Sequence, residues 1–246
     1  YIRVEAGMDP DQIKKAIKKA KRSTDKPTFI EVKTEIGFGT DVAGTSQSHG
    51  KPLNQHQVSE LKKALDWNYE AFEIPQDVYE YYRKTIILRG RRAFRKWQKM
   101  ISAYALQHPN KYKQLNESFN QGETSLNALY ELDFSEDEAT RVSGGKVIQK
   151  ASQLLPQLIG GSADLSSSTK AKGIDGDFTP THRTGRNINF GVREHAMGAI
   201  INGMTLHGGL KVFGGAFFVF SDYMKPAIRL AAIMQIPSIF VMTHDS

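Results

Sequence analysis

The stretch Phe190-Gly-Val-Arg-Glu-His-Ala-Met197 connects an expected strand at 187–192 to an expected helix at 194–207. The helix is indicated by apolar side chains that recur at helical spacing, and the strand by a short apolar run. A strand that leads directly into a helix is the repeating unit of parallel α/β sheets. The junction also places one carboxylate, that of Glu194, in the first turn of the helix and beside a buried sheet.

The same alternation extends in both directions from this junction. Strands are expected at 158–165, 211–218 and 238–243, and helices at 146–154 and 221–234. Because strands and helices alternate, the second half of the chain predicts a doubly wound parallel sheet with helices on both faces.

The first residues predict a second α/β unit. Residues 1–4 and 28–34 have the β-branched and aromatic content of strands. Between them, Asp9 is placed to cap a helix and Pro10 occupies its first turn. Strand, helix and strand form a βαβ unit, which we interpret as the last one of a parallel sheet whose earlier strands lie outside this chain.

Helical patterns occupy the middle of the chain, at 56–67 and 78–106, and the polar stretch at 108–137 is interpreted as a linker. The fold class that follows is α/β, with two incomplete doubly wound parallel-sheet domains joined by a helical linker region. We place the domains at residues 1–128 and 129–246.

Composition narrows the class of protein. The chain has 246 residues and no cysteine, which excludes disulfides, thiolate metal sites and a thiol nucleophile. No apolar run approaches the roughly 20 residues of a membrane-spanning helix. The first residues also lack the pattern of a signal peptide. We therefore expect a soluble, cytoplasmic protein without a membrane partner.

The formal net charge of +7 raises the question of nucleic-acid binding. The positive charge is concentrated at 11–22 and 83–99, and both stretches have the pattern of amphipathic helices with a charged, solvated face. No nucleic-acid-binding motif accompanies the charge, so we expect no nucleic-acid partner. Attraction of anionic, phosphorylated metabolites is the milder expectation.

Taken alone, the side chains at the strand ends allow two interpretations. Glu194 could hold or move a proton, or it could be a first-turn acid that interacts with the helix dipole or with Arg193. Phe217, Phe220 and Tyr223 follow the next expected strand, where they could line a site for a flat ring or pack in the core.

Several motifs occur in one order along the chain. They are Ile36-Gly-Phe-Gly39 with Ser48-His-Gly-Lys-Pro-Leu53, Gly160-Gly-Ser-Ala-Asp-Leu165, Gly191-Val-Arg-Glu-His-Ala-Met197, the three aromatic residues, and Thr243-His-Asp-Ser246. In this order and near this spacing, the motifs resemble those of the thiamine diphosphate-dependent transketolase family. The resemblance covers essentially the whole chain.

The resemblance implies roles for residues around the cofactor. Glu194 corresponds to the glutamate that hydrogen-bonds the aminopyrimidine ring and so promotes formation of the cofactor ylid. Phe220 corresponds to the ring that stacks on the pyrimidine, with Phe217 and Tyr223 completing the aromatic set. Asp164 is expected to lie close to the cofactor.

The resemblance also implies a substrate site. Arg141, Ser168 and His244 match residues that hold a sugar phosphate, and a guanidinium group and a hydroxyl suit that ligand. His49 matches a histidine that faces both the thiazolium ring and the substrate, which makes it a catalytic, cofactor-binding and substrate-binding candidate. Thr169 stands where the family usually has asparagine, a departure in the loop after Ser168.

The Gly-Asp-Gly motif and following asparagine with which the family holds Mg²⁺ and the diphosphate do not occur in this sequence. The resemblance therefore implies thiamine diphosphate and Mg²⁺ as cofactors, with metal ligands outside this chain. The chain resembles a central fragment, from the end of a diphosphate-binding domain to the start of a pyrimidine-binding domain.

The implied activity is the reversible transfer of a two-carbon ketol unit from a ketose phosphate to an aldose phosphate. In the complete enzyme we expect a homodimer that acts in the pentose phosphate pathway, and little turnover by the fragment alone. The alternatives are a related thiamine enzyme, such as a dihydroxyacetone synthase or a deoxyxylulose phosphate synthase, and a split-enzyme subunit or non-catalytic paralogue.

Overall fold

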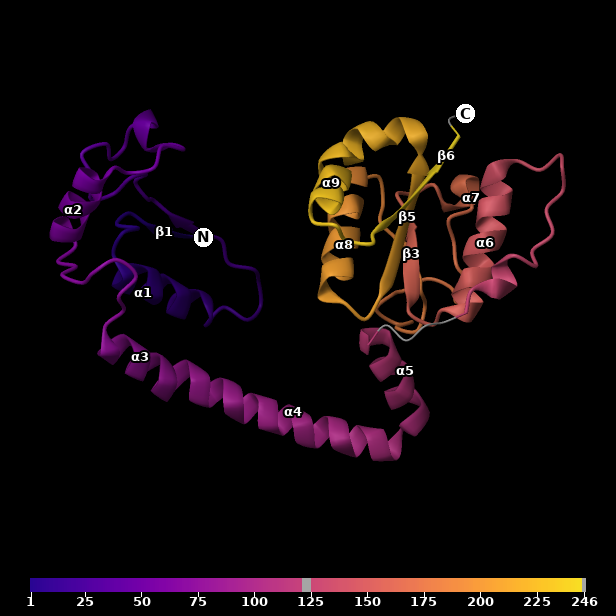
Figure 1. The fold of residues 1–246 in the computed structure, drawn as a ribbon, viewed down its shortest axis with the longest axis horizontal. Helices are drawn as coiled ribbons and strands as arrows, with labels where there is room; N and C mark the ends of the chain where they lie inside the picture. The colour runs from indigo at the N-terminus through magenta and orange to yellow at the C-terminus, as the bar shows by residue number, and fades with distance from the viewer. Residues whose placement is uncertain (121–124, 245–246) are drawn as a thin grey trace. The chain divides into compact units, whose positions relative to one another are not determined.

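The computed structural model describes residues 1–120 and 125–244 of the chain. These residues form two compact units, Tyr1–Arg92 and Ala93–Ser246, which are divided within one long helix (Figure 1). Within the described ranges, no helix is both long and apolar enough to cross a membrane.

The first unit contains the predicted βαβ arrangement. Strand β1 (Ile2–Val4) and strand β2 (Ile30–Val32) pair in parallel, and helix α1 (Pro10–Ala20) connects them. The helix begins as the sequence predicts, because the Asp9 carboxylate accepts a hydrogen bond from the backbone N–H of Asp11 at 2.9 Å.

Three further helices follow in the first half of the chain. Helix α2 (Gln55–Ala64) begins with a capping box in which the side chains and backbone of Asn54 and Gln57 exchange hydrogen bonds. Helix α3 (Gln76–Tyr82) continues through a π-helical turn at Arg83–Ile87 into α4 (Leu88–Gln107). The long helix expected at 78–106 is therefore present, with a local widening near its first third.

The linker assigned to 108–137 contains a helix that the sequence analysis did not predict, α5 (Pro109–Asn120). The helix is mostly polar, but one of its aromatic residues makes a tertiary contact. The Phe119 ring lies 6.3 Å from the ring of His207, also in the second unit. The same ring lies against Gly209, where an added Cβ would approach it to 2.8 Å. Residues 121–124 of the expected linker lie outside the described residues.

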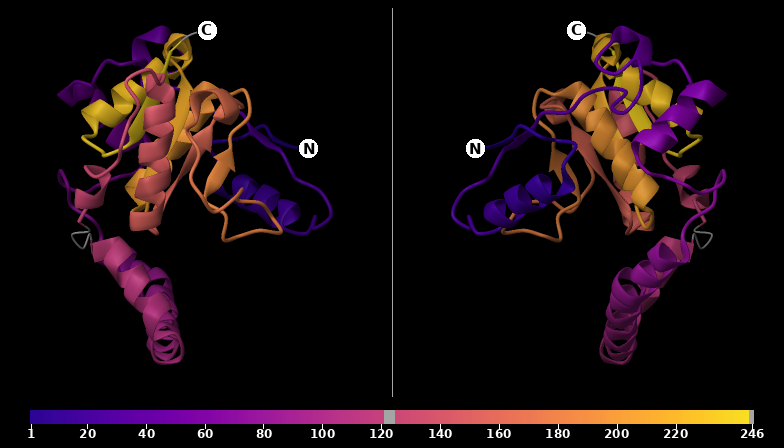
Figure 2. Two further views of the ribbon diagram at one scale, coloured as in Figure 1. Left: turned by 90° about the vertical axis from the view of Figure 1, so that its right-hand side faces the viewer. Right: turned by 90° about the vertical axis from the view of Figure 1, so that its left-hand side faces the viewer.

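The second unit is built on a four-stranded parallel sheet in the order β4-β3-β5-β6. The strands are β3 (Leu158–Ser162), β4 (Asn187–Asn189), β5 (Lys211–Phe217) and β6 (Ile239–Thr243). The helices are α6 (Thr140–Leu154), α7 (Ser166–Thr169), α8 (Glu194–His207) and α9 (Ser221–Ile233). Helices α6 and α7 cover one face of the sheet and α8 and α9 the other (Figures 1 and 2). The predicted doubly wound parallel sheet is thus confirmed for this unit.

Strand β5 separates two apolar clusters because successive side chains point to opposite faces. Val212 packs with residues of α8 and α9 on one face, and Phe213 packs with residues next to α6 on the other. Gly214 allows α8 to lie directly on the strand, since a Cβ there would come within 2.2 Å of Ile201 Cδ1.

The strand order determines where a ligand can bind. Strand β3 lies between β4 and β5, so the chain leaves β3 toward one neighbour and later returns to the other. Open α/β sheets bind ligands at such a switch point, outside the carboxyl ends of the strands. That edge is the start of α7, α8 and α9.

Candidate active site

A cavity of about 500 Å³ lies at the carboxyl ends of β3, β4 and β5. Its walls come from the segments that follow these strands. The lining residues are Ala163, Asp164, Leu165, Val192, Glu194, Phe220 and Tyr223. The cavity therefore brings together four predicted site residues that are distant in sequence.

Glu194 is the first residue of α8, directly after Arg193, which has a non-helical backbone conformation. Among the described residues its carboxylate has no hydrogen-bond or ion-pair partner, so it is available to a ligand. The amino-terminal end of a helix favours a negative charge. An unpartnered carboxylate in a partly apolar cavity can accept a hydrogen bond from a ring nitrogen or share its proton.

The three predicted aromatic residues form a continuous contact series. The rings of Phe217 and Phe220 are stacked with centroids 6.0 Å apart, and Phe220 and Tyr223 are 6.2 Å apart. Of the three, Phe220 and Tyr223 line the cavity, whereas Phe217, the last residue of β5, does not. Phe217 therefore packs against Phe220, one of the two rings that line the cavity.

Asp164 lies in the turn between β3 and α7 and has a left-handed backbone conformation, with φ of 65°. This region is unfavourable for residues with a Cβ and is held by surrounding structure. The side chain of Asp164 is exposed at the cavity, beside Leu165. The turn thus places a second carboxylate in the site.

Arg141 and His244 come together although 103 positions separate them in sequence. Arg141, the second residue of α6, has its Nη1 atom 3.5 Å from Nδ1 of His244, which follows β6. Phe217 contacts the His244 ring edge-on, at 6.0 Å between centroids. Arg141 donates to this ring nitrogen, and its remaining guanidinium N–H groups suit an anionic ligand. Residues 245–246 of the Thr-His-Asp-Ser motif lie outside the described residues.

Ser168 lies in α7, whose first residues follow the Asp164 turn. The structure does not bring Ser168 into contact with the Arg141–His244 pair. Its position depends on the same short segment that carries Asp164.

His49 belongs to the other unit, in the glycine-rich loop after β2. The loop is held by local bonds, such as that from the N–H of Gly44 to the carbonyl of Ile36 at 2.8 Å. Gly37 and Gly44 adopt positive φ angles of 68° and 69°, which explains the glycines in the loop. The His49 side chain is exposed. Its place relative to Glu194 stays a prediction.

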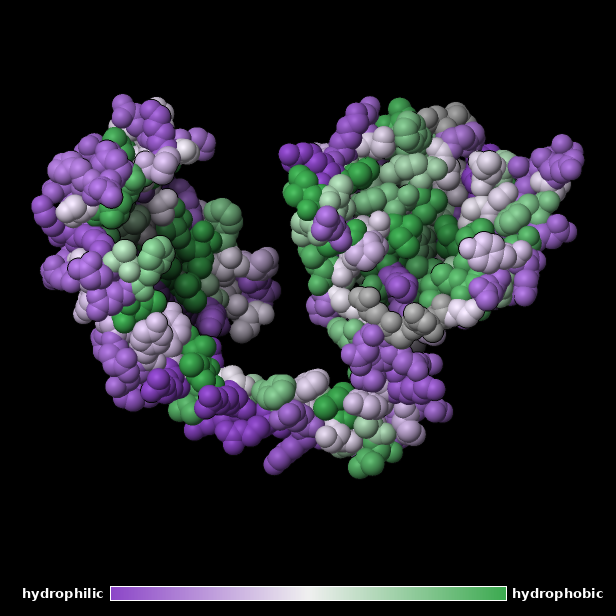
Figure 3. Space-filling model, viewed as in Figure 1, coloured by the Kyte–Doolittle hydropathy of each residue, from purple (hydrophilic) through white to green (hydrophobic). Residues whose placement is uncertain are grey.

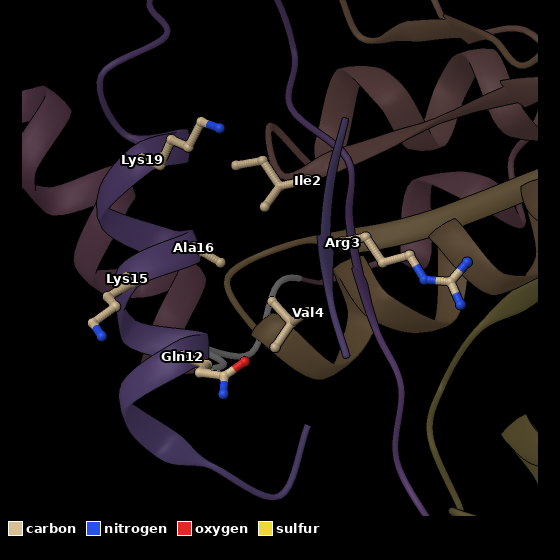
Figure 4. A pocket seen from close by; sticks show the side chains of 7 residues that line it. All are labelled: Ile2, Arg3, Val4, Gln12, Lys15, Ala16 and Lys19. Atoms are coloured by element: carbon tan, nitrogen blue, oxygen red, sulfur yellow. The ribbon is translucent and has the colours of Figure 1, made fainter. Parts of the chain in front are cut away.

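The first unit also contains a hollow, of about 260 Å³, between β1 and α1. Figure 4 shows Ile2, Val4 and Ala16 directed into the space between strand and helix. None of the predicted site residues lines this hollow. In the described parts of the chain, no three His, Asp or Glu side chains are grouped as a metal site.

Three further residues line the cavity although the sequence motifs do not indicate them as site residues: Ala163, Leu165 and Val192. Val192 is 77% exposed, an unusual position for a valine. The signal that could have found it is its place between Gly191 and Arg193, at a strand end beside the predicted carboxylate.

Two family models match the chain. Residues 1–124 match the thiamine diphosphate binding domain of transketolase, and residues 137–246 match the pyrimidine binding domain of transketolase.

Curated relatives resemble the chain over its full length. The transketolase of Geobacillus stearothermophilus is 48% identical over 100% of this chain and 38% of its own length. The transketolase of Aquifex aeolicus is 44% identical over 99% of the chain and 35% of its own length. The chain therefore spans a little over a third of these relatives.

Solved structures show the same arrangement. Transketolase from Leishmania mexicana has a TM-score of 0.84 and 32% identity, over 100% of this chain and 37% of that protein. Transketolase from Pichia stipitis in complex with sedoheptulose-7-phosphate has a TM-score of 0.81 and 34% identity, over 100% of this chain and 38% of that protein.

Proposed function

The chain belongs to the transketolase family, and on that premise we propose that it contributes the pyrimidine-binding side of a transketolase active site. The activity of the complete enzyme is the reversible transfer of a two-carbon ketol unit from a ketose phosphate to an aldose phosphate. One observation carries the proposal. The unpartnered carboxylate of Glu194 shares a cavity with Phe220, at the switch point of the parallel sheet.

The chemistry of the cavity fits thiamine diphosphate. A flat, nitrogen-rich ring needs an aromatic surface and a carboxylate, and Phe220, Tyr223 and Glu194 supply both. When bound, the cofactor supplies a nucleophilic carbon that allows a bond next to a carbonyl group to break and form. Glu194 holds the proton that it shares with a pyrimidine nitrogen, and Phe220 orients the ring and excludes water from it.

Asp164 lies at the same cavity and is proposed to contact the cofactor. Its carboxylate and that of Glu194 follow neighbouring strands, β3 and β4. Two acids at one site take different roles when their surroundings differ. Glu194 begins a helix of 14 residues, whereas Asp164 lies in an exposed turn, so we assign the proton-sharing role to Glu194.

Arg141, His244 and Ser168 are proposed to bind the phosphate of the sugar. The contact between Arg141 and His244 supports this role, because it brings a guanidinium group and an imidazole together at the carboxyl-terminal edge of the sheet. A solved relative that binds sedoheptulose-7-phosphate supports the class of substrate. His49 is proposed to stabilise the oxygen of the reacting carbonyl, through contacts that the complete enzyme provides.

Several finer assignments belong to the same proposal. Mg²⁺ is proposed as the second cofactor, with ligands outside this chain, and the complete enzyme is proposed to be a homodimer. We place it in the cytoplasm and in the pentose phosphate pathway. Family membership supports these assignments.

The test is the variant Glu194→Gln in the complete enzyme, with a matched exposed control, Glu131→Gln. Glutamine keeps the size of the side chain but does not hold the proton, so we expect kcat to fall by about 100-fold or more. Steady-state kinetics with a ketose phosphate and an aldose phosphate measure the effect. The control variant should retain full activity. Activity of Glu194→Gln within about twofold of the unchanged enzyme would contradict the proposal, a factor well below the range expected for proton transfer.

A further inference from the structure

Ser162 is the last residue of β3, and its side chain is completely buried, with 0% exposure. Its hydroxyl donates a hydrogen bond to the carbonyl of Gly215 in β5 at 2.7 Å. The same oxygen accepts a hydrogen bond from the backbone N–H of Leu165 at 3.2 Å. The Ser162 hydroxyl therefore connects β3 with β5 and with the turn that follows β3 at the cavity.

The turn between Ser162 and Leu165 contains Asp164 in its left-handed conformation. A residue with a Cβ stays in this region only when neighbouring groups hold it there. The hydrogen bond from the Leu165 N–H to the Ser162 hydroxyl closes the turn across Asp164. The backbone carbonyl of Ser162 also accepts a bond from the N–H of Phe190, at 3.1 Å, and so connects the turn to the segment before Glu194.

Leu165, which receives this contact, is also the residue directly before α7. The carbonyl of Leu165 accepts hydrogen bonds from both the N–H and the side-chain hydroxyl of Thr169, each at 2.9 Å. These bonds define the single turn of helix that carries Ser168. A displacement of Leu165 would therefore move Ser168 together with Asp164.

From these contacts we infer that Ser162 is a positioning residue that sets both the cofactor carboxylate Asp164 and the phosphate-binding hydroxyl of Ser168. The inference rests on the proposed function of the cavity. Ser162 itself is buried beneath the site and touches neither ligand. Its hydroxyl acts by holding one turn in place between two strands.

The experiment uses the complete enzyme with Ser162→Ala, which leaves the Leu165 N–H and the Gly215 carbonyl without their partner. We expect the dissociation constant for thiamine diphosphate, measured by titration calorimetry, to rise about tenfold, the effect of an unpaired buried group. The KM for a phosphorylated ketose should rise by a similar factor, and the KM for an unphosphorylated ketose less. The preference for phosphorylated donors should therefore fall, a change that simple destabilisation does not produce.

The matched control is Ser238→Ala. The Ser238 hydroxyl also bonds to a neighbouring side chain, Asn202 Oδ1 at 2.9 Å, but it lies before the start of β6, at the opposite end of the sheet. This variant should lose stability yet keep the dissociation constant and the donor preference of the unchanged enzyme. If Ser162→Ala does not fold, Ser162→Cys replaces it, because sulfur fills the space but forms weaker hydrogen bonds. For Ser162→Cys we again expect a higher dissociation constant for thiamine diphosphate and a lower preference for phosphorylated donors.

Two results would overturn the inference. One is a folded Ser162 variant whose cofactor affinity and donor preference stay within twofold of the unchanged enzyme. The other is an equal change in Ser238→Ala. Failure of the proposed function is recognised separately, in the unchanged enzyme. If the unchanged enzyme does not transfer a ketol unit, the proposed function is contradicted before any variant is compared.

Discussion

The two units differ in how much of their apolar surface they bury. Among the described residues, the buried apolar side chains of the first unit are Val4 and Ala16, and the same unit leaves Tyr1 and Phe29 about 70% exposed, at 72% and 69%. The second unit has two apolar clusters, one on each face of its sheet. Figure 3 shows apolar residues at the visible surface of both units. The units differ instead in the number of apolar side chains that are buried in their interiors.

This difference decides how firmly each unit holds its own proposed site residues. Glu194, Phe220 and Asp164 follow strands of a sheet that is packed on both faces, so their positions are set within the second unit. His49 follows a two-stranded sheet that packs against helix α1. The first unit therefore holds the His49 loop with a smaller apolar core than the one that supports Glu194 in the second unit.

The largest expected effect follows from shortening a side chain in the core of the second unit. Met197 has 0% exposure and packs in the cluster between β5 and α8. Met197→Ala should lower the free energy of unfolding by about 2–5 kcal/mol, because a cavity remains. Urea unfolding of the 246-residue chain, followed by circular dichroism, measures the change.

The matched variant in the first unit is Ile17→Ala, on α1, where the side chain is 44% exposed. Its effect should be below about 1 kcal/mol, since little buried area is lost. Equal losses for the two variants would remove the contrast between the units.

A smaller, pH-dependent effect comes from Glu138 in the second unit, whose side chain is 14% exposed. Hydrogen bonds from Lys146 Nζ at 2.7 Å and from the Ser143 hydroxyl at 2.8 Å hold the pKa of Glu138 below its ordinary value of 4.5. A lowered pKa stabilises the folded state above pH 4.5, and this contribution disappears as the pH falls through the pKa of the folded state.

Lys146→Met should therefore destabilise the chain at pH 7, and this effect should decline as the pH falls below 4.5 and through the lowered pKa of Glu138. Lys146 Nζ also lies 5.7 Å from the centre of the Phe134 ring, a contact whose loss does not depend on pH over this range. The exposed pair Lys63–Glu60 of the first unit is the comparison, because Lys63 also lowers the pKa of Glu60. Lys63→Met should show a smaller pH dependence in the same unfolding experiment. A larger dependence for Lys63→Met would reverse the comparison.

The sequence allowed much of the second unit to be predicted because its signals are local. Helix α8 has the predicted bounds, since a strand end precedes Glu194 and Gly208 follows the helix with a φ of 81°. Helix α5 could not be found in this way. Its polar residues resemble a linker, and its contact is made by Phe119 with a distant residue, His207.

In the candidate site, too, contacts between residues that are distant in sequence could not be predicted. Resemblance to a family indicated Arg141 and His244, but their 3.5 Å contact depends on how α6 and β6 pack. That Val192, Asp164 and Phe220 line one cavity follows from the strand order β4-β3-β5-β6, which no local pattern reveals. Local chemistry predicts which residues are candidates, and tertiary packing decides which of them meet.

Native-state hydrogen exchange of the 246-residue chain tests the difference between the units most directly, because it reports the stability of each strand in one experiment. We predict that the backbone amides of β3 and β5 exchange on the order of 100-fold more slowly than those of β1 and β2, because the former open only with the core of the second unit. Similar protection in all four strands would contradict the account. It would show that the first unit holds the His49 loop as firmly as the second unit holds Glu194.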